Sequence, residues 1–415
     1  MLPDALHADD VEACRRLLAD GSKSFALASK VLPERVREPA TVLYAFCREA
    51  DDAVDSVQLV TERTVDALRY RVDRVYRGWP IDQAVDRALA RVVEASRLPR
   101  VLVDALIDGL AWDAEGRRYE TLDDLHGYAA RVAGTVGAAM TIFMGPRDPL
   151  VLARACDLGV AMQLTNIARD VGEDAGRGRV YLPLSWLHEA GIDVDAFLSR
   201  PVASEPLAHV VRRLLASADD LYRRADEGIT HLPRDCRIAI RAASLIYSEI
   251  GREVERARFD SVSRRAVVSK WRKLWLLLRA TSSVLWAPAR LKDPPLEPVR
   301  FLVSASAAAA ARAPGTRSAR GSAPREARSS SSASSTSTPP GARLARQRPR
   351  PPRPTTPDRS TSTSSSPAGG SGPCSRRSSR PAASRSRSST ARASPRHIGS
   401  GTRAGPSSRR WCASG

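Results

Sequence analysis

The chain has 415 residues, 42% of them hydrophobic, and a formal net charge of +19. Residues 301–415 hold 21 arginines and only two acids, which leaves 44 basic and 44 acidic side chains in residues 1–300. The folded part is therefore formally neutral, and its charge gives no reason to expect that it binds nucleic acid.

Cysteine usage and the N-terminus indicate the compartment. The six cysteines are scattered and form no C-x-x-C pair, which is typical of free thiols in a reducing compartment. The first ten residues are acidic and lack the basic and apolar regions of a secretory signal. No apolar stretch approaches the roughly 20 residues needed to span a bilayer. We therefore expect a cytoplasmic protein, or one bound peripherally to the inner membrane.

Residues 1 to about 290 carry the pattern of a nearly continuous series of helices. Apolar residues recur at helical spacing, for example at Val103, Leu106 and Leu110, and the alternation typical of strands is rare. Glycines and prolines fall between these stretches, where helices are expected to end. The pattern predicts a single all-α helical bundle, expected to span residues 1–295.

The first chemical signal lies on a helix expected to start near Pro39. Asp51 and Asp55 are four residues apart and so share one face, where two like charges oppose helix formation unless a cation lies between them. A hard divalent cation with oxygen ligands fits this spacing. The alternative, a solvated acidic face, is weakened by the apolar residues around the acids. Tyr44 and Arg48 align with the two acids.

A second stripe of oxygen-bearing side chains lies on another predicted helix. Asn166, Asp170 and Asp174 recur every four residues, and Gln163 and Glu173 flank the same face. A single acid pair of this kind is common on helix surfaces. Two such stripes, each with an embedded arginine, favour the binding of metal ions together with a diphosphate.

Basic and hydroxyl side chains beside the two stripes are candidates for holding a diphosphate. They are Ser22, Lys23, Arg48, Arg169, Arg177 and Arg179. For Lys23 or Arg177 alone, a solvated surface charge is an equally good interpretation.

Mg²⁺ usually binds one or two carboxylates plus phosphate oxygens and water. A metal ion that withdraws charge from a bound diphosphate allows the bond between the substrate carbon and the diphosphate oxygen to ionise. Such a reaction needs no protein nucleophile. In agreement, the sequence shows no Ser/His/Asp or Cys/His arrangement.

Four motifs in this order resemble those of the squalene/phytoene synthase family, over about residues 10–290. They are Ser22-Lys23-Ser24-Phe25 and residues 44–55, 128–137 and 163–174. Residues 109–120 and 263–269 are most similar to the bacterial members of the family that form phytoene in carotenoid pathways.

The resemblance implies a fold and a reaction. The fold would be the all-α isoprenoid synthase fold, a single helical bundle around a central cavity. The reaction would be the head-to-head condensation of two geranylgeranyl diphosphates, through prephytoene diphosphate, to phytoene. The cofactor would be Mg²⁺, for which Mn²⁺ can substitute. No NADPH is expected, because only squalene synthases end with a hydride from NADPH. A phytoene desaturase would receive the product.

The resemblance also assigns roles to residues. The metal positions would be Asp51, Asp55, Asn166, Asp170 and Asp174, and the catalytic group would comprise these aspartates with Tyr44 and Arg48. Diphosphate or pocket positions would be Ser22, Arg48, Gln163 and Arg169. The cavity wall would include Phe25, Tyr44, Tyr128 and Tyr247, whose aromatic faces can stabilise a carbocation.

Two alternatives remain open at this point. A squalene or dehydrosqualene synthase would use the shorter farnesyl diphosphate, and the motifs do not reveal the depth of the pocket that sets the chain length. A non-catalytic scaffold or assembly protein of the same fold would be expected to lose the acidic motifs, and both motifs are present.

Residues 270–279 mix tryptophan, leucine and basic side chains. Such a helix can lie in a membrane interface, which would suit an enzyme with an apolar product. The alternative is a last core helix whose basic side chains reach out to water. The sequence therefore predicts peripheral membrane contact without excluding a purely structural helix.

Composition changes after Pro295. Residues 296–415 are dominated by Arg, Ser, Pro and Ala and carry few large apolar side chains, which predicts a disordered low-complexity tail. Such a tail can bind RNA or anionic lipid. A passive extension, or a shift of reading frame in a GC-rich gene, explains the same composition, and we favour these two explanations.

Overall fold

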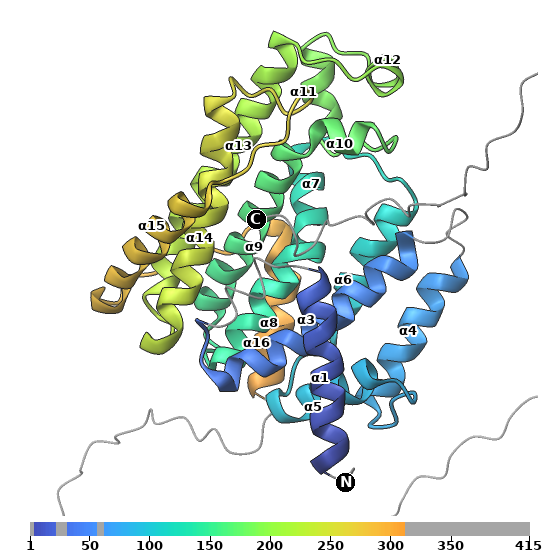
Figure 1. The fold of residues 1–415 in the computed structure, drawn as a ribbon, viewed down its shortest axis with the longest axis vertical. Helices are drawn as coiled ribbons and strands as arrows, with labels where there is room; N and C mark the ends of the chain where they lie inside the picture. Colours follow the sequence, from blue (N-terminus) through green and yellow to red (C-terminus); the bar gives the residue numbers. More distant parts are fainter. Residues whose placement is uncertain (1–3, 22–30, 56–61, 312–415) are drawn as a thin grey trace, which may run out of the picture. The chain divides into compact units, whose positions relative to one another are not determined.

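The computed structural model describes residues 4–21, 31–55 and 62–311, and in these residues it contains helices and no strand (Figure 1). The N-terminal half holds α1 (Asp4–Gly21), α3 (Glu34–Asp55), α4 (Glu62–Tyr76), α5 (Ala84–Ser96), α6 (Arg100–Ala114), α7 (Leu122–Ala129), the π-helical turn η1 (Ala130–Gly134) and α8 (Thr135–Met144). The C-terminal half holds α9 (Pro149–Arg169), α10 (Val171–Ala175), α11 (Leu184–Glu189), α12 (Val194–Ser199), α13 (Glu205–Ile229), α14 (Arg234–Arg256), α15 (Lys270–Ala280), the 3₁₀ turns η2 (Thr281–Leu285) and η3 (Glu297–Val299), and α16 (Arg300–Ala311). The all-α prediction is confirmed.

Helix α9 is a core helix of the bundle. Its start is fixed locally, because the Asp148 side chain accepts hydrogen bonds from the backbone N–H groups of Leu150 and Val151 and Pro149 occupies the first turn. Helices α8, α13, α14 and α16 contact it. Contrary to the expectation that no apolar stretch is long enough, α9 could cross a membrane by length and composition, yet 78% of its apolar window is buried inside the helical unit. Its apolar character is thus explained by burial against other helices.

Glycines let the backbones of α9 and its neighbours touch. A Cβ atom on Gly137 of α8 would overlap the carbonyl oxygen of Ala155 in α9, and one on Gly159 of α9 would overlap the carbonyl oxygen of Ala133 in η1. Only glycine, which has no Cβ atom, fits where two helix backbones come this close together. These contacts fix how closely α9 lies to the helix pair before it.

The helical fold continues past the boundary expected at residue 295. Val299 and Leu302 have no exposed surface and Val303 only 3%. Val299 ends η3, which packs against α7 and η1, whereas Leu302 and Val303 lie on α16, which packs against α6, α8 and α9. Helix α16 thus belongs to the packed helices up to residue 311, because a short apolar group can be buried even where the surrounding composition is that of a polar tail. The domain boundary at residue 295 stays a prediction. The expectation of disorder for 312–415 lies outside the described residues.

Candidate active site

Helix α3 carries the first acidic motif. It begins at Glu34, and Pro39 lies inside it, because the backbone N–H groups of Val36 and Arg37 already bond to the carbonyl of residue 33. The start expected near Pro39 is therefore five residues too late. Asp51 is only 4% exposed. Asp55 is the last residue of the helix, and its side chain lies outside what the structure describes.

Tyr44 and Arg48 lie on the same helix, next to the end of α1. Tyr44 is 3% exposed, and the Arg48 guanidinium forms an ion pair of 2.7 Å with Asp52. A Cβ atom on Gly21, the last residue of α1, would overlap the Tyr44 hydroxyl and lie 3.5 Å from Cδ of Arg48. The chain thus leaves α1 directly beside these two side chains. The predicted diphosphate and wall residues Ser22, Lys23 and Phe25 follow Gly21 and lie outside the described residues.

The second acidic motif is broken at Asp170, where one continuous helix was expected. Asp170 has φ −102° and ψ 15°, and it separates α9 from α10. The backbone N–H of Asp170 still bonds to the Asn166 carbonyl at 2.9 Å, and that of Asp174 to the Asp170 carbonyl at 2.8 Å. The spacing of the three side chains is thus close to helical although the helix axis is interrupted.

The loop between α14 and α15 contacts the chain next to this helix break. The Gly172 N–H donates to the carbonyl of Ser261 at 2.9 Å, and a Cβ on Gly172 would lie 2.7 Å from Cα of Val262. A side chain at position 172 would therefore push the loop away. The loop is held against α10 by this close backbone contact.

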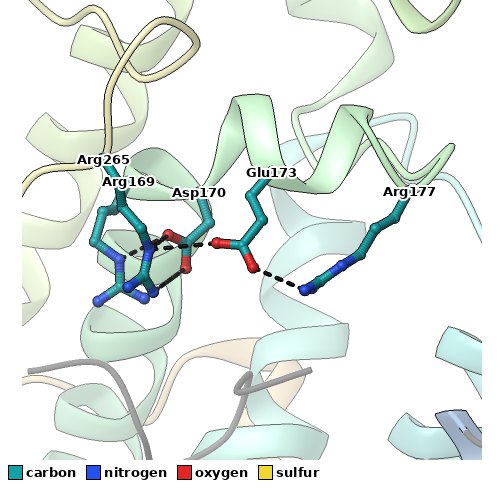
Figure 2. Close-up of polar contacts among 5 residues, drawn as sticks. All are labelled: Arg169, Asp170, Glu173, Arg177 and Arg265. Atoms are coloured by element: carbon teal, nitrogen blue, oxygen red, sulfur yellow. Dashed lines mark hydrogen bonds and ion pairs between the residues drawn. The ribbon is translucent and has the colours of Figure 1, made fainter. Parts of the chain in front are cut away.

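This loop delivers Arg265 to the second motif (Figure 2). Its Nε donates to Oδ1 of Asp170 at 2.8 Å, and Nε of Arg169 donates to the same oxygen at 2.8 Å. Arg265 also lies 3.4 Å from Glu173, which accepts a 2.8 Å hydrogen bond from Arg177. Five charged side chains thus form one cluster, which comes from the end of α9, from α10 and the turn after it, and from the loop between α14 and α15.

The two guanidinium groups set the charge state of Asp170. Burial by itself would raise the pKa of this carboxyl, but the hydrogen bonds and charges of Arg169 and Arg265 outweigh burial and lower the pKa below its usual value. Arg169 is itself 2% exposed. The cluster therefore holds a partly buried, ionised carboxylate, 16% exposed, between two positively charged guanidinium groups.

Arg265 was not among the residues assigned a role from the sequence. Ninety-five residues separate it from Asp170, and no helical spacing relates positions so far apart. The resemblance of segment 263–269 to phytoene-forming enzymes assigns no role to a single residue in it. The tandem Arg264-Arg265 was the signal available, but it does not say which acid either arginine meets.

The other predicted residues of this half lie around the cluster. Gln163 and Asp174 are 7% and 8% exposed. Asp174 and Arg179 line one small cavity together with Tyr181. Asn166 on α9 and Tyr247 on α14 are partly buried, and Arg177 is exposed at the surface beside Glu173. Their roles toward a substrate remain predictions.

Tyr128 lies in a buried hydrogen-bonded group. Its hydroxyl donates to Oδ2 of Asp113 at 2.7 Å, and the Tyr181 hydroxyl donates to Oδ1 at 2.5 Å. The rings of these two tyrosines and of Tyr119 pack together with centroids 5.2 to 6.2 Å apart. Asp113 is 6% exposed, so these donors satisfy a buried carboxylate. Tyr128 therefore has a structural role in addition to the wall role predicted for it.

The oxygen donors suit a hard metal ion such as Mg²⁺. Carboxylates of Asp51, Asp170 and Asp174 and the amide of Asn166 are the ligand type that Mg²⁺ prefers. In the part of the chain that the structure describes, no three His, Cys, Asp or Glu side chains are grouped closely enough to hold a metal ion. A metal here would need further oxygens, and a diphosphate supplies them.

Comparison with known families decides the identity. The model of the squalene/phytoene synthase family matches residues 18–272, more than half of the chain. The chain belongs to the squalene/phytoene synthase family. Among its members, the chain is 50% identical over 305 residues to a phytoene synthase of Rhodobacter capsulatus, covering 72% of this chain and 90% of that protein. It is 51% identical over 314 residues to a phytoene synthase of Cereibacter sphaeroides, covering 72% and 88%.

Solved structures of this family share the fold. A dehydrosqualene synthase crystallised with a ligand is similar with a TM-score of 0.62 and 31% identity, covering 67% of this chain and 98% of that one. A squalene synthase from Alicyclobacillus acidocaldarius is similar with a TM-score of 0.58 and 24% identity, covering 62% and 97%. The isoprenoid synthase fold expected from the sequence is thus confirmed.

Proposed function

We propose that this protein is a phytoene synthase, a prenyltransferase that joins two geranylgeranyl diphosphates head to head. The observation that carries the proposal is the 50% identity with a phytoene synthase along 90% of that protein's length. Both acidic motifs are intact, which favours a catalyst over a non-catalytic scaffold of the same fold.

The residues of the chain fit the reaction that we propose. Mg²⁺, or Mn²⁺ in its place, would be held by Asp51, Asp55, Asn166, Asp170 and Asp174 and would withdraw charge from a bound diphosphate. Arg169 and Arg265 add two positive charges beside Asp170 that can neutralise a departing diphosphate. Tyr44 and Tyr247 offer aromatic faces to a carbocation.

The bonds balance without a redox partner. The C–O bond of the first substrate breaks, and diphosphate leaves with the electron pair. A double bond of the second substrate attacks the resulting cation, and loss of one proton closes the cyclopropane of prephytoene diphosphate. Loss of the second diphosphate, rearrangement and loss of a second proton give phytoene. No NADPH is required in this sequence.

The alternative substrate is farnesyl diphosphate, favoured by the structural similarity to a dehydrosqualene synthase. Incubation of the protein with Mg²⁺ and each diphosphate, without NADPH, separates the two. We expect phytoene from geranylgeranyl diphosphate. Dehydrosqualene from farnesyl diphosphate alone would replace the proposed substrate, and the absence of any hydrocarbon product would overturn the enzymatic proposal.

Replacement of Arg265 tests the residue that the fold adds to the site. We expect Arg265→Gln to lower turnover by about 10- to 100-fold, the usual loss when a group supporting a metal ligand is removed. The neighbouring Arg264→Gln is the matched control, because this exposed arginine lies in the same loop. Steady-state kinetics of both variants measure the effect, and equal turnover in the two would contradict the assignment.

We also propose that the protein works in the cytoplasm, at the inner membrane, and passes phytoene to a desaturase. An apolar product of this size is poorly soluble in water, so transfer within lipid is favoured. Handover predicts faster desaturation of phytoene made in place than of phytoene added in detergent. Equal rates would count against it.

A further inference from the structure

Helix α15 carries apolar side chains on two opposite faces. One face is covered: Leu276 and Ala280 are 1% and 0% exposed and pack against Ala242 and Leu245 of α14. In Figure 1, α15 lies along α14 on the outside of the helical unit. The helix is thus anchored to the fold through this covered face.

The opposite face of α15 is open and apolar. Its residues recur at i, i+3, i+4 and i+7, which places them on one side of a helix with 3.6 residues per turn. They are Trp271, Leu274, Trp275 and Leu278, exposed by 81%, 57%, 48% and 68%. Leu285 of η2, which follows α15 directly, is 87% exposed. Large apolar side chains gathered in this way usually mark an interaction surface.

The charged side chains in the segment that contains this face are all positive. Residues 261–292 contain eight basic side chains and no acid. Lys270 and Arg279 flank the open apolar face on its two sides, given the helical spacing, and Arg279 lies 5.7 Å from the Trp275 ring. Glu249 of α14, which pairs with Arg272 at 3.0 Å, is 5% exposed and so presents almost no negative charge at the surface.

We propose that the open face of α15, together with Leu285, is a docking surface for an anionic lipid bilayer. Tryptophan and leucine would enter the boundary between headgroups and acyl chains, while Lys270 and Arg279 stay at the level of the phosphates. Tryptophan is enriched at that depth. A second copy of the chain is a poorer partner, because pairing two such faces would bring like charges together without an acid between them.

The surface is joined to the candidate site by a short connection. Arg265, which contacts Asp170, precedes Lys270 by five residues. Docking of α15 would therefore hold the loop beside α10 close to lipid. The use of this arrangement for releasing an apolar product rests on the proposed function, whereas the docking surface itself does not.

Vesicle flotation of the full chain tests the proposal. The probe is phosphatidylcholine vesicles with a quarter phosphatidylglycerol, and the test variant is Trp271→Glu with Leu278→Glu. The arginines of residues 301–415 also attract anionic lipid, so binding is measured at about 500 mM NaCl, where charges are screened within about 4 Å. We expect the wild type to retain binding and the variant to lose about tenfold or more, because two exposed apolar side chains no longer enter lipid.

The matched control is Trp79→Glu, which removes a tryptophan that is 70% exposed in the loop after α4. This control should bind like the wild type. Trp271→Gln with Leu278→Gln repeats the test without added charge, and thermal unfolding checks that each variant is folded. Equal binding of variant and control would overturn the proposal, as would a wild type that binds only at low salt. A variant that instead converts a dimer into a monomer would show that the face meets a second copy.

Discussion

Asp170→Asn is expected to lower turnover by about 100-fold or more, because several kcal/mol of charge stabilisation of the leaving diphosphate are lost and each 1.4 kcal/mol is a factor of ten. The variant keeps the size of the side chain and removes its charge. Asp170 is the carboxylate on which Arg169 and Arg265 converge. Product formation from geranylgeranyl diphosphate and Mg²⁺ measures the loss.

Asp10→Asn is the matched control for this variant. Asp10 is more deeply buried than Asp170, at 1% exposed, and its carboxylate likewise accepts hydrogen bonds from two arginines, Arg87 and Arg91. Removing its charge should lower stability and leave turnover of the folded protein unchanged. If both variants lose turnover equally, the effect of Asp170→Asn is one of folding. Normal turnover of Asp170→Asn would remove this residue from the metal set.

Gly159→Ala is expected to cause a large loss of stability. The added Cβ would overlap the backbone carbonyl of Ala133 and lie 2.9 Å from the backbone nitrogen of Gly134. Backbone cannot rotate away as a side chain can, so α9 and η1 must separate. Overpacking of this kind costs about 3 kcal/mol, which corresponds to a fall in unfolding temperature of about 5 °C or more. Thermal unfolding followed by circular dichroism measures it.

Gly134→Ala is the control for Gly159→Ala, because it makes the same glycine-to-alanine exchange, with the same effect on helix propensity, without the backbone overlap. A Cβ at this position would lie 3.7 Å from Cβ of Cys156, an ordinary contact on the same interface between η1 and α9. This variant should unfold within about 2 °C of the wild type, since alanine favours a helix over glycine by up to about 1 kcal/mol. Equal destabilisation by both substitutions would show that the close approach at Gly159 is not the cause.

The sequence by itself determined the helical class and predicted which residues would carry the chemistry. Helical periodicity relates positions three and four apart, so it placed Asp51 with Arg48 and Tyr44, and Asp170 with Asn166 and Asp174. The resemblance of these motifs gave the family, which the comparison over residues 18–272 confirmed. These inferences needed only neighbours within one helix, and such neighbours follow from local geometry.

Only the tertiary structure decided which distant residues meet. The loop that carries Arg265 lies against Gly172, close to the helix break at Asp170. No local sequence pattern predicts a backbone contact between residues 89 positions apart, such as Gly172 and Ser261. Tyr128 meets Asp113 because α6 and α7 pack together, and the apolar residues of α16 are buried only because α6, α8 and α9 leave room for them. Such contacts depend on how helices pack, which the pattern along one helix does not contain.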